Sequence, residues 1–119
     1  CDRSKPELKG LTPKNAGILE SHGIQAAICT DHPVIPIQYL PLSAAICRKE
    51  GLSSKAALES ITIRAAQIVG IDHRVGSLKA GKDADFCVFS ADPLSVDASP
   101  EMVFINGTIV RDHRNGGNA

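Results

Sequence analysis

One short segment constrains the fold more than any other part of the chain: a mostly apolar run that ends abruptly in polar and charged residues. Residues 24–29 read Ile-Gln-Ala-Ala-Ile-Cys and follow Gly23. A run of this kind is typical of a strand buried on both faces of a parallel sheet. Thr30, Asp31 and His32 come next, and Pro33 prevents the strand from continuing. The segment therefore predicts a carboxylate and an imidazole at the C-terminal end of a buried strand.

Ligands and catalytic groups collect at that end of the strands in α/β folds. Asp31 is therefore the main candidate for a functional side chain. The local pattern leaves a second interpretation open, in which Asp31 only caps the following turn.

The bulk composition narrows the classes of protein. A length of 119 residues suits one domain or a piece of a larger one, and 43% hydrophobic residues can build a core. Thirteen basic and thirteen acidic residues give no net charge, and only 3% are aromatic, so we expect no nucleic-acid partner. No apolar run approaches the roughly 18 residues of a membrane span, and no signal peptide is visible. We therefore expect no membrane partner.

The cysteine pattern indicates a reducing, cytoplasmic setting. The four residues Cys1, Cys29, Cys47 and Cys87 are widely spaced, and no Cys-x-x-Cys occurs. Three of them sit in apolar stretches, as reduced core thiols do, which argues against a disulfide framework or a metal site made of cysteines alone. The first residue is Cys and not Met, so we expect an excised part of a longer protein or a removed leading segment.

Local signals divide the chain near Gly70. The first part has helix-start signals at Thr12-Pro13, Pro41, Ser53 and Thr62. Its helix-stop signals are Gly23, Gly51 and Gly70. The second part is turn-rich, with a strand predicted over residues 84–89 and a hairpin over 102–110 that turns at Asn106-Gly107. We expect an α/β part over residues 1–70, a small β part over 71–113 and a mobile tail over 114–119.

An ordered set of short motifs covers the chain from about Lys5 to Arg111. The motifs are Thr-Asp-His-Pro-Val from Thr30, Gly-Leu-Ser from Gly51, Asp-His-Arg-Val-Gly-Ser-Leu from Asp72, Gly-Lys-Asp-Ala-Asp from Gly81, Asp-Pro-Leu from Asp92 and Ile-Asn-Gly from Ile105. Together they resemble the C-terminal end of the amidohydrolase superfamily, closest to its imidazolonepropionase-like branch. One departure is Arg64-Ala65, where many relatives have Asn-Pro, and it bears on local helix geometry.

This resemblance implies an α/β fold made of the last βα units of a TIM-type (β/α)₈ barrel, followed by the C-terminal share of a small β-sandwich. Residues 24–29 would then be the last barrel strand, residues 41–69 the last barrel helix with its extension, and residues 84–110 the share of the sandwich. The family assembles that sandwich from both ends of its chain.

The resemblance also implies the chemistry. Asp31 would bind a catalytic divalent metal, with zinc as the expected ion, and would act as general base on the metal-bound water. His32 would contact substrate or hydrogen-bond a metal ligand, or it would be a loop histidine bonded to backbone. We assign no catalytic role to the other histidines, His22, His73 and His113. The charged residues Lys82, Asp83 and Asp85 are expected to serve the geometry of a turn.

The remaining metal ligands of the family, including its His-x-His pair, are absent from this sequence. One Asp cannot hold a catalytic zinc, which needs about three protein ligands. We therefore expect the chain alone to be inactive. We also expect it to pair with the remainder of the barrel, to self-associate or to be partly disordered, because its apolar surface needs cover. The leading interpretation is part of an enzyme that hydrolyses an amide or cyclic amide C–N bond of a small molecule. The alternatives are a non-catalytic α/β interaction module and a deaminase of the same superfamily.

Overall fold

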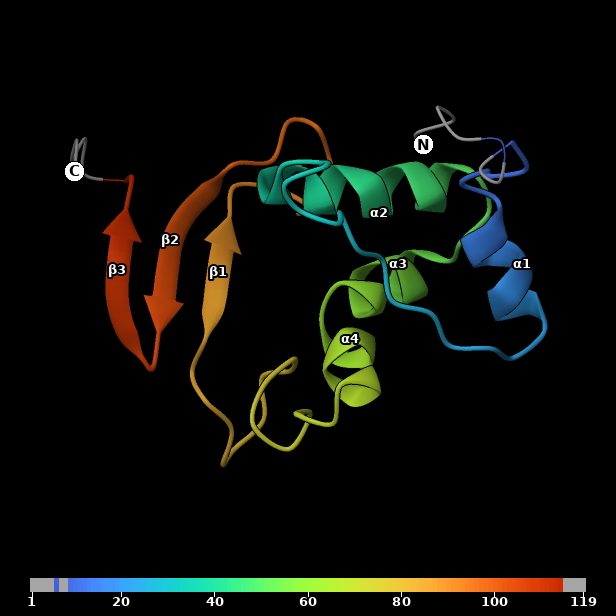
Figure 1. The fold of residues 1–119 in the computed structure, drawn as a ribbon. Helices are drawn as coiled ribbons and strands as arrows, with labels where there is room; N and C mark the ends of the chain where they lie inside the picture. Colours follow the sequence, from blue (N-terminus) through green and yellow to red (C-terminus); the bar gives the residue numbers. More distant parts are fainter. Residues whose placement is uncertain (1–5, 7–8, 115–119) are drawn as a thin grey trace.

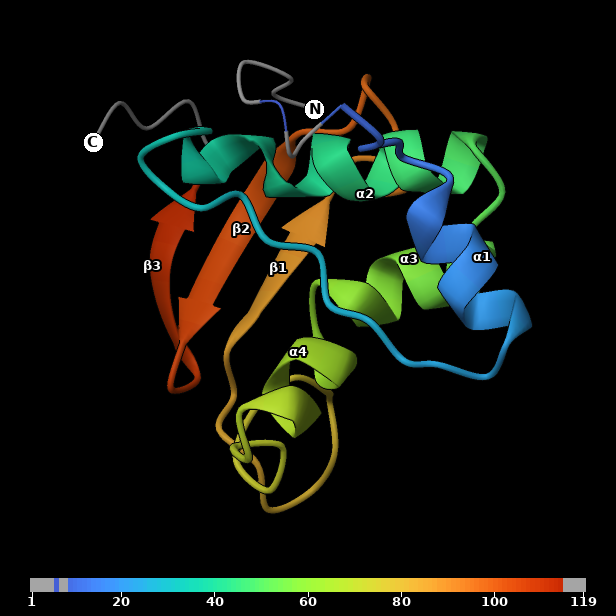
Figure 2. The same cartoon turned by 45° about the vertical axis from the view of Figure 1, so that its right-hand side comes forward.

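The structure is a computed structural model that describes residue 6 and residues 9–114. Helices occupy one side of the molecule and an antiparallel sheet the other, as both views show (Figures 1 and 2). The elements of the described part are α1 (Asn15–Ser21), η2 (Ile37–Tyr39), α2 (Leu40–Lys49), α3 (Ser54–Ser60), α4 (Ile63–Ile68), β1 (Phe86–Phe89), β2 (Pro100–Ile105) and β3 (Thr108–Asp112). No helix in these residues is long and apolar enough to cross a membrane. In the described residues all helices therefore precede the three strands along the chain.

The sheet has the strand order β1-β2-β3, with both pairs antiparallel. Ile105 pairs with Thr108, which leaves a two-residue turn in which Asn106 and Gly107 have φ values of 49° and 74°. Two positive φ values are the signature of the tight turn whose twist matches a hairpin. The predicted hairpin is therefore confirmed. Across the other pair, the rings of Phe86 and Phe104 stack with their centroids 4.3 Å apart.

Most of the predicted helix boundaries are correct. Gly23 ends α1 in a left-handed conformation, and the N–H of Ile24 donates to the carbonyl of Leu19. The Ser53 hydroxyl caps α3 by accepting from the N–H of Ala56. Thr12 does not cap α1: the helix starts later, at Asn15, and the Thr12 hydroxyl accepts instead from the N–H of Lys14, at 3.4 Å.

The hydrophobic core is small and lies among the helices. Its buried members are Ala44, Leu52, Ala56, Ala57 and Leu94. Leu94 is the exception among them, because it comes from the connection between β1 and β2 and not from the helical half of the sequence. Leu94 therefore brings the two parts of the chain into apolar contact.

A polar contact supports the same junction. The guanidinium of Arg48 on α2 donates to the carboxylate of Asp92 at 2.6 Å and to the carbonyl of Leu94 at 3.0 Å. Asp92 also accepts from the N–H of Leu94 at 2.9 Å, and these contacts hold the pKa of its carboxyl below the usual value. Arg48 of helix α2 therefore binds the first and the last residue of the Asp92-Pro93-Leu94 turn.

The strand predicted over residues 24–29 is not formed within the described chain. Its backbone is extended but belongs to no sheet, and Ile24 is 52% exposed. A strand needs a neighbour to take up its N–H and C=O groups, and the sheet of this chain lies elsewhere. The N–H of Ile28 donates instead to the carbonyl of Ser60, at the end of α3. The predicted mobile tail lies outside the described residues, except for Arg114.

Candidate functional site

The candidate site lies where the extended segment meets a turn. After Gly23 the chain runs extended to Thr30, which is 5% exposed and is the point at which the segment becomes buried. The chain then turns through residues 31–35 and enters η2 and α2. Figures 1 and 2 show this segment crossing from the end of α1 to the start of α2. Asp31 is the first residue of the turn.

Backbone hydrogen bonds fix Asp31 in an uncommon conformation. Its φ is 52°, in the left-handed region that Asp tolerates better than most residues. Its N–H donates to the Cys29 sulfur at 3.2 Å, and its carbonyl accepts from the N–H of Val34 at 2.8 Å. The N–H of Ile35 donates to the Thr30 carbonyl at 3.3 Å. The turn is therefore closed on both sides of Asp31.

The carboxylate of Asp31 is uncommitted. The residue is exposed, and no hydrogen bond or ion pair reaches its side chain from residue 6 or residues 9–114. The interpretation in which Asp31 caps the turn would have the carboxylate accept a backbone N–H, but the turn is closed by the carbonyl of Asp31 instead. An exposed carboxylate on a fixed backbone suits a metal ligand.

His32 is exposed directly beside Asp31. Its ring makes no hydrogen bond within the part of the chain that the structure describes, so the backbone-bonded alternative does not occur there. The ring is free to meet a substrate or a group outside these residues.

The described residues do not form a complete metal site. They contain no group of three or more His, Cys, Asp or Glu side chains that could hold an ion. Cys29, Cys47 and Cys87 are free thiols, and burial raises the pKa of the Cys47 thiol, which disfavours the thiolate that binds metals. Asp31 therefore fits the chemistry of one ligand, and a metal would need further donors from outside the described residues.

The other charged residues that stand out in the sequence have structural partners. Asp83 pairs with Arg74 at 2.7 Å, and Lys82 donates to the Val75 carbonyl at 3.3 Å. Asp85 accepts from the N–H of Asn106 at 2.8 Å and so holds the hairpin turn. The prediction that these residues serve turn geometry is confirmed.

A polar cluster of Glu20, Ser53, Glu59 and Arg64 was not predicted. Glu20 on α1 accepts from both the N–H and the hydroxyl of Ser53, at 2.9 and 2.7 Å, and these two bonds lower the pKa of its carboxyl. Arg64 pairs with Glu59 at 3.1 Å and lies 4.0 Å from Glu20. The cluster ties α1, which leads into the Asp31 segment, to α3 and α4. Glu20 lies 33 positions from Ser53, so their contact has no local sequence signal, and Arg64 stood out only as a departure from the family pattern.

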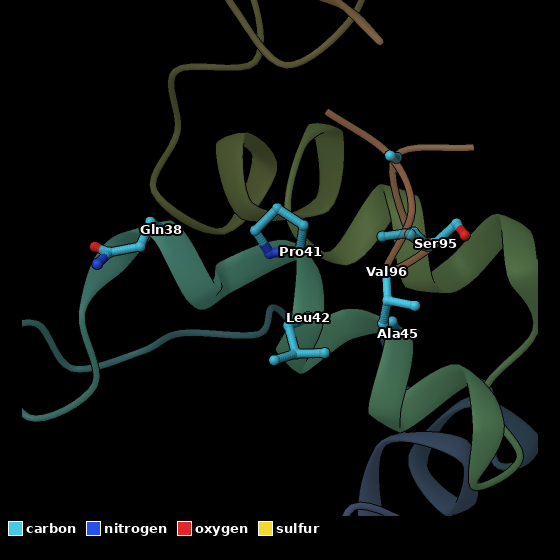
Figure 3. A pocket seen from close by; sticks show the side chains of 8 residues that line it. Gln38, Pro41, Leu42, Ala45, Ser95 and Val96 are labelled. Carbon is cyan, nitrogen blue, oxygen red and sulfur yellow. The ribbon is translucent and has the colours of Figure 1, made fainter. Parts of the chain in front are cut away.

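Two surface cavities lie away from Asp31. One, of about 290 Å³, is lined by Pro41, Leu42 and Ala45 of α2 and by residues of the β1–β2 connection, including Val96 (Figure 3). The other, of about 510 Å³, lies on the sheet beside Glu101, Arg111 and His113. Asp31 and His32 line neither cavity.

Comparison with known proteins gives consistent results. The sequence profile of the Amidohydrolase family matches residues 6–110. The chain is 40% identical over 97 residues to "Amidohydrolase tasK" of Hapsidospora irregularis, covering 82% of this chain and 10% of that protein. It is 31% identical over 107 residues to an imidazolonepropionase of Cupriavidus necator, covering 82% of this chain and 24% of that protein.

A solved structure agrees with these sequence matches. An amidohydrolase from Thermotoga maritima superposes with a TM-score of 0.90 at 36% sequence identity. That match covers 94% of this chain and 29% of the solved chain. The 119 residues therefore span less than a third of the length of each of these three relatives.

Proposed function

Because the chain belongs to the amidohydrolase family, we propose that it forms part of a metal-dependent hydrolase that cleaves an amide or cyclic amide C–N bond of a small molecule. The observation that carries this proposal is the state of Asp31: an exposed, uncommitted carboxylate on a backbone that hydrogen bonds fix on both sides. In this proposal residues 1–70 belong to a barrel, with residues 24–29 as a strand once neighbouring strands are present. Residues 71–113 belong to a composite β-sandwich.

In the proposed mechanism Asp31 has two roles. Its carboxylate would hold a divalent metal, with zinc as the expected ion, together with ligands from outside these residues. When bound, such a metal lowers the pKa of water from about 15.7 to about 7. Asp31 would accept a proton from the attacking water as the water oxygen adds to the carbonyl carbon, and would pass that proton to the leaving nitrogen as the C–N bond breaks. His32 stands beside this carboxylate and is proposed to contact the substrate.

The exposed apolar surface supports the proposal that other residues cover this chain. Ile24, Leu78 and Val96 are 52%, 74% and 83% exposed, and the core holds few large side chains. Covering surface of this kind stabilises a protein by about 25 cal/mol per Å². We propose that the remainder of the barrel covers it, and that the isolated chain self-associates. A monomer at micromolar concentration in analytical ultracentrifugation, with a cooperative melt, would contradict this.

The enzymatic proposal is tested on the protein expressed from the complete reading frame that contains these residues. We expect purified protein to contain a divalent metal and to hydrolyse amides in a substrate panel, whereas the 119-residue chain alone has neither property. Release of ammonia from a C–NH₂ carbon would indicate a deaminase instead. Absence of both metal and turnover would favour a non-catalytic interaction module. The free thiols of the described residues support a reducing, cytoplasmic setting.

A further inference from the structure

The part of the chain that leads to Asp31 is bound at both ends of helix α3. At the first end, the carboxylate of Glu20 on α1 accepts from the N–H and the hydroxyl of Ser53, the residue that caps α3, at 2.9 and 2.7 Å. At the other end, the N–H of Ile28 donates to the carbonyl of Ser60, the last residue of α3, at 3.1 Å. The length of α3 therefore sets the spacing between the two attachment points.

Side-chain burial shows that one face of the extended segment lies on the helices. Ala26, Ile28 and Thr30 alternate with more exposed residues, and Thr30 is 5% exposed. Alternation of this kind places one face of an extended chain against its support. Ile28 packs on the helical core, as does Ala16 of α1. Helix α1 and the segment therefore share one support before the chain reaches Asp31.

A close backbone approach holds α1 at a second point. A Cβ on Gly17 would lie 2.8 Å from the Gly51 carbonyl carbon, so α1 touches the backbone between α2 and α3 there. A helix held at one point can still pivot about it. Glu20 lies about one turn further along α1 and prevents this, with the guanidinium of Arg64 4.0 Å from its carboxylate.

We propose that Glu20 is a positioning residue for Asp31: its carboxylate fixes α1 on the N-terminal end of α3, and with it the start of the segment that ends at the candidate metal ligand. This inference rests on the function proposed above, which gives Asp31 a metal to hold. Partners that orient a metal ligand typically contribute about 10- to 100-fold in metal affinity or activity. A displacement of about 1 Å caused far from the chemistry can cost about a hundredfold in rate.

The competing explanation is that Glu20 stabilises the fold and does nothing for Asp31. Asp92 provides the matched control. Like that of Glu20, its carboxylate accepts from one backbone N–H, that of Leu94 at 2.9 Å, and from one side chain, that of Arg48 at 2.6 Å. These bonds join α2 to the β1–β2 connection. Truncating either carboxylate therefore removes two comparable bonds, but only Glu20→Ala detaches α1 from α3.

The first measurement is amide hydrogen exchange on protein from the complete reading frame, in peptides that cover residues 24–35. The N–H groups of Ile28, Val34 and Ile35 are hydrogen-bonded and report on this segment. We expect exchange there to be at least about fivefold faster in Glu20→Ala than in Asp92→Ala, because only the first variant loosens the segment locally. Equal exchange in the two variants would overturn the inference.

The second measurement is the dissociation constant for zinc, by competition with a chelator, together with steady-state kinetics on an amide substrate. Glu20→Ala should bind zinc about tenfold more weakly and lose about tenfold in kcat at unchanged KM. Asp92→Ala should match the unaltered protein in all three quantities. Unchanged zinc affinity in Glu20→Ala, or an equal loss in both variants, would show that Glu20 acts on stability alone.

Two further outcomes are provided for. If either alanine variant fails to fold, Glu20→Gln and Asp92→Asn replace the pair with the same expected order. The proposed function fails separately: the unaltered protein then binds no zinc, or Asp31→Asn binds it as before, while the difference in exchange between the two variants persists. In that case Glu20 still anchors the segment, and its role toward a metal is refuted.

Discussion

The helical core around Leu94 and the segment around Asp31 differ in how completely this chain surrounds them. Leu94 is 4% exposed, packed among alanines and flanked by the contacts of Arg48. Asp31 and its neighbours Val34 and Ile37 are exposed, and hydrogen bonds fix only their backbone. The first region stabilises the chain by itself. In the second region the backbone is fixed, but the described residues leave its side chains exposed.

The comparison separates stability from function. Substitutions in the helical core around Leu94 should change the free energy of unfolding and affect activity only through folding. Substitutions around Asp31 should do the reverse, because an exposed, uncommitted side chain contributes little to the folded state.

The largest expected effect on stability is that of Leu94→Ala. Removing this buried side chain leaves a cavity between the helices and the β1–β2 connection, at a cost of about 2–5 kcal/mol. The measurement is denaturant unfolding, with Val96→Ala as the control, because Val96 lies two residues away and is 83% exposed. Equal shifts for the two variants would mean that Leu94 does not join the parts as described.

Gly17→Ala should have the next largest effect. A Cβ at Gly17 would lie 2.8 Å from the Gly51 carbonyl carbon and 2.9 Å from its oxygen, and backbone atoms cannot rotate away. We expect a loss of about 1–3 kcal/mol as α1 moves away from the end of α2. Gly10→Ala is the matched control, since no atom lies within 4 Å of a Cβ built there. A neutral Gly17→Ala would show that α1 is not held in place.

The third prediction concerns the loss of folded-state stability at low pH. The bonds from Ser53 lower the pKa of the Glu20 carboxyl below its usual value of 4.5, so the unfolded chain takes up this proton at a higher pH than the folded one. The stability that Glu20 provides is therefore complete above about pH 5 and is lost as the pH falls through its folded pKa.

Thermal melts of the unaltered protein and of Glu20→Gln from about pH 6 to about pH 3 measure this difference. The two melting temperatures should converge as the pH falls. A constant gap would contradict a role for the ionised carboxylate in holding α1.

The features that the sequence predicted correctly depend on interactions between residues close together in the chain. Gly23, Ser53 and Asn106-Gly107 act through bonds to residues a few positions away, so their effects can be read from the sequence alone. The strand expected over residues 24–29 could not be confirmed in the same way, because a strand depends on neighbours that the apolar pattern does not supply.

The contacts between distant residues had no sequence signal. Arg48 donates a hydrogen bond to Asp92, which lies 44 positions away in the sequence, and Ser53 donates one to Glu20, which lies 33 positions away. Asp31 could be singled out from its place after an apolar run. Its left-handed backbone and its uncommitted carboxylate appear only in the structure.

The smallest expected effect on stability is that of Asp31→Asn. Nothing in the described residues bonds to this carboxylate, so the change in the free energy of unfolding should stay within about 0.5 kcal/mol. The control is Asp97→Asn, another exposed carboxylate, whose residue is held through its backbone N–H by Ser95. Unfolding curves of the two variants should overlap.

The central claim is tested most directly by the metal content of that same pair of variants, measured on protein from the complete reading frame together with amide turnover. The account predicts that Asp31→Asn loses metal and at least about a hundredfold in kcat while its melting temperature is kept, because a ligand and a proton acceptor are lost together. Asp97→Asn should match the unaltered protein. Full metal content and full turnover in Asp31→Asn would contradict the account.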